Sequence, residues 1–314
     1  MSIPSNAMPE AIDSQRMAPP VLSANRPLYW SIRRELWENR SIYIAPLAVA
    51  GVGLLGFLIG LMGFSHSKHA QAAPDAAHQQ VTLAMPYAHA AWVLLLTGFL
   101  VGIFYSLDAL HGERRDRSIL FWKSLPVSDL TTVLAKASIP LVVLPLVVFG
   151  VTVILHLVML VSDAAVQVMK GGSVATLWSP SPLFQMELVL LYGLTVMALW
   201  HAPLYAWLLL VSGWARRATF LWAVLPFLAI SIFERIAFRT SYFGSLLKDR
   251  LIGFAANALS FHTPDGVPID PHFIPLAQLT PGKFLSTPGL WVGLVVAAGL
   301  LAAAVRLRRY REPI

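Results

Sequence analysis

The stretch HGERRDRSILFWKSLPVSDL, residues 111–130, is a burst of mixed charge that runs into apolar and aromatic residues. It lies between two long apolar segments, 88–110 and 132–161, which carry very few charged side chains. Each segment is long enough to cross a membrane, because a helical span needs roughly 20 predominantly apolar residues. The stretch therefore predicts two membrane helices joined by a short polar loop.

The composition of the whole chain supports the same class. Of its 314 residues, 57% are hydrophobic and 12% are charged, and the mean hydropathy is +0.66. Soluble domains usually carry about 25% charged residues, so this chain has too little polar surface to cover itself in water. It contains no cysteine, which excludes disulfides and cysteine-ligated metal or iron–sulfur sites.

Division of the chain at its charged residues gives six apolar segments and predicts an all-α, polytopic integral membrane protein. The runs are too long, and alternate too little, for membrane β-strands. We expect residues 1–27 to form a flexible cytoplasmic tail, 28–306 a single transmembrane domain, and 307–314 a cytoplasmic C-terminal tail. The six expected spans are about 41–64, 88–110, 132–161, 183–211, 218–235 and 288–305.

The distribution of lysine and arginine predicts the orientation. If the N-terminus is cytoplasmic, 16 of the 23 basic residues fall on cytoplasmic segments, as the positive-inside rule requires. We therefore expect both termini in the cytoplasm and attribute the net charge of +7 to topology. Nucleic acid is not an expected partner, whereas membrane lipids are.

An amphipathic segment, RPLYWSIRRELWENRSIYIAP at 26–46, precedes the first span. Its aromatic and basic residues are spaced to share a helix in the headgroup plane, with the cations toward lipid phosphates. The alternative is the ordinary aromatic and basic flank of a membrane helix. The residues that we assign to this interface are Trp30, Arg33, Arg34, Glu35, Trp37 and Arg40.

Residues 111–130 are predicted to contain a short helix, a break and a second helix. The first would run from Glu113 to Leu125, because the residue before a proline is pushed out of the α region. Ser128 and Asp129 are typical of a helix start, where a side chain caps the first amides. The ILFW run at 119–122 exceeds what topology requires and favours burial at the interface or insertion into a partner's groove.

Three stretches together carry a family resemblance. The loop ERRDRSILFWKSLPVSDLTTVLAK (113–136) resembles that of the ABC-2 type permeases, the membrane subunits of six-helix ABC exporters. RRELWENR (33–40) is similar to the family's interfacial elbow helix, and HAPLYAWLLLVSGWARRA (201–218) resembles a stretch of one branch. The resemblance covers nearly the whole chain after Pro27.

The resemblance implies a permease in the bacterial inner membrane that exports a hydrophobic or amphipathic substrate: a lipid-like molecule, a drug or an antimicrobial peptide. It implies a dimer with a second permease copy or a paralogue, and cytoplasmic ABC ATPase subunits that carry ATP and Mg. It also places a coupling helix in the first cytoplasmic loop. The coupling residues would be Glu113, Arg114, Arg115, Asp116, Arg117, Leu120, Phe121, Trp122 and Leu125.

The outer segment 235–287 is expected to contain a helix. SLLKDRLIGFAANAL, residues 245–259, places apolar residues at helical spacing with charges on another side. The resemblance implies a helical hairpin here. The helix would be re-entrant or interfacial; the alternative is an amphipathic helix that packs on lipid for stability alone.

Enzyme motifs are missing from the sequence. PGKFLS at 281–286 has Gly-Lys without the rest of a nucleotide-binding P-loop, and no H-E-x-x-H occurs. We therefore expect no catalytic residues, no metal site and no cofactor on this chain, with ATP hydrolysis left to a partner. The histidines of the first outer loop, His66, His69 and His78, are more typical of solvated residues than of metal ligands.

Ionisable residues within the expected spans are candidates for a substrate path or for gating. They are His156, Glu187 and His201, the last with Pro203 two residues on. The alternative is structural, since a neutral histidine can bond a backbone carbonyl of a neighbouring helix.

Three classes of function are compatible with these features. The first is an exporter subunit driven through the 113–125 helix. The second is a membrane enzyme that acts on a lipid, for which no nucleophile or acid–base cluster is evident. The third is a stand-alone ion-coupled transporter, which would be expected to show internal repeats and several intramembrane acids.

Overall fold

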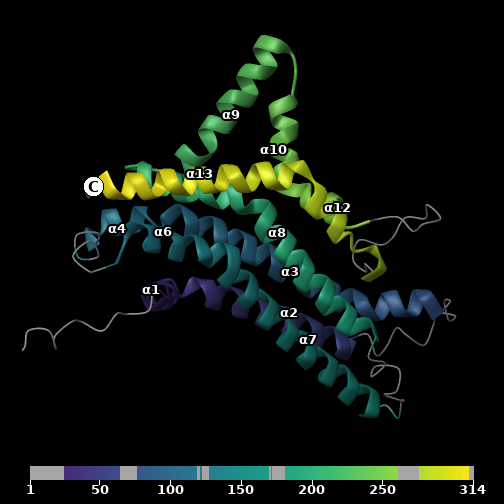
Figure 1. The fold of residues 1–314 in the computed structure, drawn as a ribbon. Helices are drawn as coiled ribbons and strands as arrows, with labels where there is room; N and C mark the ends of the chain where they lie inside the picture. The colour runs from purple at the N-terminus through teal and green to yellow at the C-terminus, as the bar shows by residue number, and fades with distance from the viewer. Residues whose placement is uncertain are drawn as a thin grey trace, which may run out of the picture.

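The computed structural model describes residues 25–63, 76–118, 121, 127–169, 171, 181–260 and 276–310. These residues form helices, and within them the only β-type pairing is an isolated bridge between Leu259 and Leu279. Six helices are long and apolar enough to cross a membrane (Figure 1). The chain is therefore an all-α, multi-pass membrane protein, as its composition predicts.

The described helices include all six spans. The first three spans correspond to α2, α3 and the continuous helix α6–η4–α7, and the last three to α8, α9 and α13. The bounds are α1 Asn25–Glu38, α2 Ser41–Gly63, α3 Ala76–Asp108, α4 His111–Arg115, α6 Asp129–Ser138, η4 Ile139–Val143, α7 Leu144–Met169, α8 Ser181–Trp214, α9 Thr219–Phe238, α10 Tyr242–Ile252, α11 Phe254–Ala258, η5 Leu276–Gln278, α12 Pro281–Ser286 and α13 Pro288–Tyr310.

The third span begins at the predicted position. Ser128 is extended, and its Oγ accepts a hydrogen bond from the backbone N–H of Thr131 at 3.0 Å, which confirms the predicted N-cap. The sequence did not reveal the π-helical turn η4, which contains Pro140. Proline lacks the N–H of a regular helical turn, and a π-turn accommodates that loss within a continuous helix.

Helix α8 is the central helix of the bundle. It packs against α3, α7 and α13, and 67% of its apolar stretch is buried. Small side chains form its contact with α13, where Ala202 and Ala206 meet Ala297. Small residues let two helix backbones approach closely, which is a main source of helix association in membranes.

Helix α9 is the least buried span, with 6% of its apolar stretch buried. It and α10 form a hairpin that projects from the side of the bundle (Figure 1). The hairpin turn is closed by Glu234, whose carboxylate accepts hydrogen bonds from Thr240 Oγ1 and from the backbone N–H groups of Tyr242 and Phe243. Most of α9 is therefore available to lipid or to another protein.

The expected outer helix is present as α10 and α11, and both contact α8. The indole of Trp200 donates to the carbonyl of Asp249 at 3.2 Å, and Tyr192 Oη donates to the carbonyl of Ala258 at 3.2 Å. The segment is thus packed on the bundle at these points.

Helix α1 and the end of α13 lie at the same end of the bundle, and both contact α6 (Figure 1). Both described ends of the chain therefore lie on the same side, as six spans require. That this side faces the cytoplasm stays a prediction.

Candidate functional site

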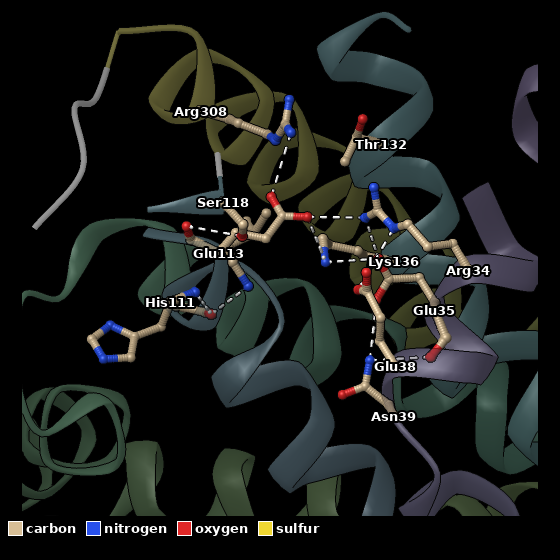
Figure 2. Close-up of polar contacts among 12 residues, drawn as sticks. Arg34, Glu35, Glu38, Asn39, His111, Glu113, Ser118, Thr132, Lys136 and Arg308 are labelled. Atoms are coloured by element: carbon tan, nitrogen blue, oxygen red, sulfur yellow. Dashed lines mark hydrogen bonds and ion pairs between the residues drawn. The ribbon is translucent and has the colours of Figure 1, made fainter. Parts of the chain in front are cut away.

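A buried ionic cluster joins four helices at the end of the bundle where α1 and the end of α13 lie (Figure 2). Its members come from α1, α4, α6 and α13, and they are widely separated in sequence. We define the ionic cluster as Arg34, Glu35, Glu113, Asp129, Lys136 and Arg308.

Glu113 of α4 lies at the centre of the ionic cluster (Figure 2). Its Oε1 is 3.0 Å from Arg34 Nη2 and 3.1 Å from Lys136 Nζ, and its Oε2 is 3.4 Å from Arg308 Nη2. One carboxylate on a short loop helix therefore contacts α1, the third span and the last span at once.

Glu35 is the second buried carboxylate. It accepts hydrogen bonds from Lys136 Nζ at 2.9 Å, Arg34 Nη2 at 2.7 Å and Tyr105 Oη at 2.8 Å. Burial by itself raises the pKa of this carboxyl, but the adjacent Lys136 and Arg34 outweigh that effect and hold its pKa below the ordinary value. Glu35 is therefore ionised at neutral pH although its side chain is only 1% exposed.

The charges of the ionic cluster balance. Arg34, Lys136 and Arg308 supply three cations and Glu35, Glu113 and Asp129 three carboxylates, and Asp129 pairs with Arg308. A buried charge is tolerated only when it is paired and hydrogen-bonded, and loss of one partner leaves an uncompensated charge. The cluster therefore behaves as a unit.

A second set of contacts fastens the beginning of the loop to the end of α8. Ser212 Oγ accepts hydrogen bonds from the backbone N–H groups of Leu110 and His111, each at 2.9 Å. Arg114 is buried and donates to the carbonyl of Gly213 at 2.8 Å. Helix α4 is thus held on one side by α8 and on the other by the ionic cluster.

The predicted coupling residues divide into two groups. Glu113 and Arg114 are buried inside the protein, whereas the three residues that follow them and Phe121 are exposed; these exposed members are Arg115, Asp116, Arg117 and Phe121. Leu120, Trp122 and Leu125 lie outside the described residues. Contact of any of them with a partner stays a prediction.

The expected continuous helix over 113–125 requires correction. Helix α4 covers only His111–Arg115, and Arg117 has a left-handed φ of 57°. A non-glycine residue rarely adopts this conformation, and it cannot continue a right-handed helix. The coupling region is therefore a five-residue helix interrupted by a turn at Asp116 and Arg117, after which Ser118 and Phe121 are again helical.

Helix α1 has two different faces. Trp30 and Trp37 are exposed, and the guanidinium of Arg33 lies 5.1 Å and 4.8 Å from their ring centroids, within cation–π range. Arg34 and Glu35, also assigned to the membrane interface, instead point into the ionic cluster. A helix is present within the predicted segment 26–46, but two of the four charged residues assigned to the membrane interface point into the protein interior. Arg40 lies exposed just after the helix.

Sequence reasoning missed Tyr105, Lys136 and Arg308 as functional candidates. The available signal was the position of Lys136 within the expected third span and of Arg308 just beyond the last one. Ionisable residues at such depth are usually paired. Their partners were not evident because they lie on other helices.

The intramembrane candidate residues lie at two separate sites. His156 of α7 and Glu187 of α8 are in contact, with Nδ1 2.5 Å from Oε1. His201 lies elsewhere on α8, between the carbonyls of Met197 and Leu251, and Phe254 packs edge-on against its ring. Pro203 lies inside α8, which continues through it.

The chain matches no family model, no curated protein and no solved structure. Across the part of the chain that the structure describes, no group of three or more His, Asp or Glu residues could hold a metal ion. The resemblance to ABC-2 type permeases therefore rests on the loop, elbow and 201–218 motifs.

Proposed function

We propose that this protein is the permease subunit of an ATP-driven ABC exporter in a bacterial inner membrane. The observation that carries the proposal is the position of Glu113. It belongs to the polar loop between the second and third spans, and it pairs with α1, α6 and α13 through the ionic cluster. A push on this loop is transmitted directly to the membrane helices.

The mechanism follows from the division of the loop into buried and exposed residues. The exposed Arg115, Asp116, Arg117 and Phe121 would contact a cytoplasmic ATPase that binds ATP and Mg. The buried Glu113 would carry the resulting displacement to the ionic cluster. Packed interfaces switch between discrete arrangements instead of deforming continuously, so α1, α6 and α13 would move together.

The substrate class is supported by the walls of two clefts. One, of about 100 Å³, lies between α3, α8 and α11, and the other, of about 600 Å³, lies between α2, α3 and α7. Both are lined almost entirely by apolar side chains. Such walls suit a hydrophobic or amphipathic molecule, for example a lipid-like molecule, a drug or an antimicrobial peptide. A second copy of the chain, or a paralogue, would complete the dimer.

A second candidate function is a stand-alone ion-coupled transporter, and the contact between His156 and Glu187 favours it. An intramembrane acid–base pair is typical of proton relays in transporters. This alternative requires no ATPase, which makes the two functions separable by experiment.

The test is co-purification with the ATPase from an adjacent reading frame that carries Walker A and signature motifs. In the exporter account, the double charge reversal Arg115→Glu with Asp116→Arg abolishes binding of that ATPase or its stimulation. The matched control is Lys248→Glu, an exposed cation on α10, which should change neither the binding nor the stimulation of the ATPase. Normal binding and stimulation in the loop variant would remove the basis of the proposal.

A further inference from the structure

The imidazole of His156 is held between two hydrogen-bond acceptors on two different helices. Its Nε2 lies 3.0 Å from the backbone carbonyl oxygen of Tyr87 in α3, and its Nδ1 lies 2.5 Å from Oε1 of Glu187 in α8. The side chain of His156 is 4% exposed and that of Glu187 is 18% exposed. The contact therefore joins three spans away from bulk water.

The two hydrogen bonds of His156 need one more proton than is present on a neutral histidine and an ionised carboxylate. A carbonyl can only accept, so Nε2 must carry hydrogen; a neutral imidazole has only that one N–H. The contact at Nδ1 then requires either an imidazolium facing a carboxylate or a protonated Glu187 that donates to Nδ1. Without the extra proton, a lone pair on Nδ1 faces the negative charge of Glu187.

Among the described residues, no lysine or arginine forms an ion pair with Glu187. Helix α2 carries no ionisable residue other than Tyr43, at its opposite end. Within the described parts of the helices packed around the pair, the titratable groups nearest in sequence to the contact are Tyr87 and His89 on α3, Asp163 on α7 and Tyr192 on α8. Among the described residues, none donates a hydrogen bond to the buried Oε2 of Glu187. Within the described part of the chain, the proton on the pair is therefore what neutralises this carboxyl.

Residues next to the pair in sequence line both apolar clefts. Ala88 and Met186, the neighbours of Tyr87 and Glu187, line the cleft between α3 and α8. Pro86, which precedes Tyr87, and Leu155, which precedes His156, line the cleft between α2, α3 and α7. Separation of His156 from Glu187 would therefore part α7 from α8 close to the lining of both clefts.

We propose that His156 and Glu187 form a proton-binding site within the membrane, which holds α7 against α8 while the proton is bound and releases the two helices when it leaves. The inference is independent of the ATPase. His201 differs, because both its ring nitrogens face backbone carbonyls and, among the described residues, no carboxylate forms a hydrogen bond with it.

The test measures the separation of α7 and α8 as a function of pH. Because the chain has no cysteine, Val161→Cys and Phe184→Cys place one spin label on each helix at positions that are 61% and 66% exposed. The distance is measured by pulsed electron spin resonance in nanodiscs from about pH 5 to about pH 10, which spans the ordinary values of carboxyl, imidazole and tyrosine groups. In the labelled protein, we expect a longer distance to replace the short one as the pH rises.

The decisive background is Glu187→Gln, whose amide donates to Nδ1 of a neutral histidine without any added proton. In it, the short distance should persist at every pH. The matched control His89→Gln alters an exposed histidine on α3 and should keep the pH response of the parent.

A single distance across the pH range in the parent, or the same transition in Glu187→Gln, would overturn the proposal. Should Glu187→Gln fail to fold, His156→Gln tests the same proton count, because its amide donates to the Glu187 carboxylate without a bound proton. A pH-dependent separation in His156→Gln would equally contradict the proposal. Neither readout involves ATP, so failure here leaves the exporter function untouched.

Discussion

Lys136 Nζ donates a hydrogen bond to Glu35 Oε1 at 2.9 Å across 101 residues of sequence. The contact joins the helix that precedes the first span to the beginning of the third. Helix α1 is therefore not held only by the lipid headgroups, as an amphipathic helix can be; it is fixed to the bundle through a buried pair of charges.

Removal of the Glu35 charge should destabilise the protein. In Glu35→Gln, Lys136 keeps only one of its two carboxylate partners, and a broken buried pair costs about 3 kcal/mol. The matched control is Glu38→Gln on the same helix, where the side chain is 46% exposed and the effect should stay below about 1 kcal/mol. Equal melting temperatures for the two variants in detergent would contradict a structural role for the Glu35 pair.

Acidification should weaken the ionic cluster. Because the pKa of Glu35 is lowered in the folded protein, its contribution to stability is complete above the ordinary carboxyl value of about 4.3 and is lost as the pH falls through the lower folded value. The melting temperature should therefore decline at acid pH more steeply in the parent than in Glu35→Gln. Parallel curves for the two proteins would show that Glu35 does not carry this dependence.

Loss of the Glu113 carboxylate should loosen three helices together. Glu113→Gln keeps the shape of the side chain but removes the charge shared by Arg34, Lys136 and Arg308. We expect faster amide hydrogen exchange in α1, in α6 and at the end of α13. Asp116→Asn, an exposed neighbour, serves as the control and should leave all three unchanged. Faster exchange confined to α4 would mean that the ionic cluster does not act as a unit.

The outer helices should depend on Arg250. Its guanidinium donates to the carbonyls of Trp200 at 3.2 Å and Gly289 at 2.9 Å and lies 4.6 Å from the Trp200 ring centroid. Arg250→Ala removes these contacts and should cost about 2 kcal/mol. Limited proteolysis checks the prediction: cleavage within α10 and α11 should accelerate in Arg250→Ala and not in Lys248→Ala. Equal cleavage of both variants would show that α10 and α11 are held by other contacts.

The spans were predictable because their signal is local. A long apolar run defines a membrane helix without reference to any other part of the chain. The cap at Ser128 is equally local, because its side chain bonds the amide of a residue three positions away. The ends of the helices were less evident, since α3 begins at Ala76, well before the expected residue 88, in a stretch that includes polar residues.

The ionic cluster was not predictable for the opposite reason. A charge near the end of a span can face lipid phosphates, water, a partner or the interior, and the sequence alone does not distinguish these environments for Arg34 or Glu113. The orientation of these two side chains depends on Lys136 and Arg308. Those residues come close to them only when α6 and α13 pack beside α1 and α4. The pairing of His156 with Glu187 across 31 residues has the same origin.

The most direct test of the account is whether ATP moves the membrane helices through Glu113. Spin labels at Ile59→Cys on α2 and Val295→Cys on α13, both exposed positions, report the arrangement of the spans in the complex with the ATPase from the adjacent reading frame. If Glu113 couples the ATPase to the spans, ATP shifts this distance in the parent, whereas Glu113→Gln still binds the ATPase but shows no shift. The same ATP-dependent shift in Glu113→Gln as in the parent would contradict this coupling.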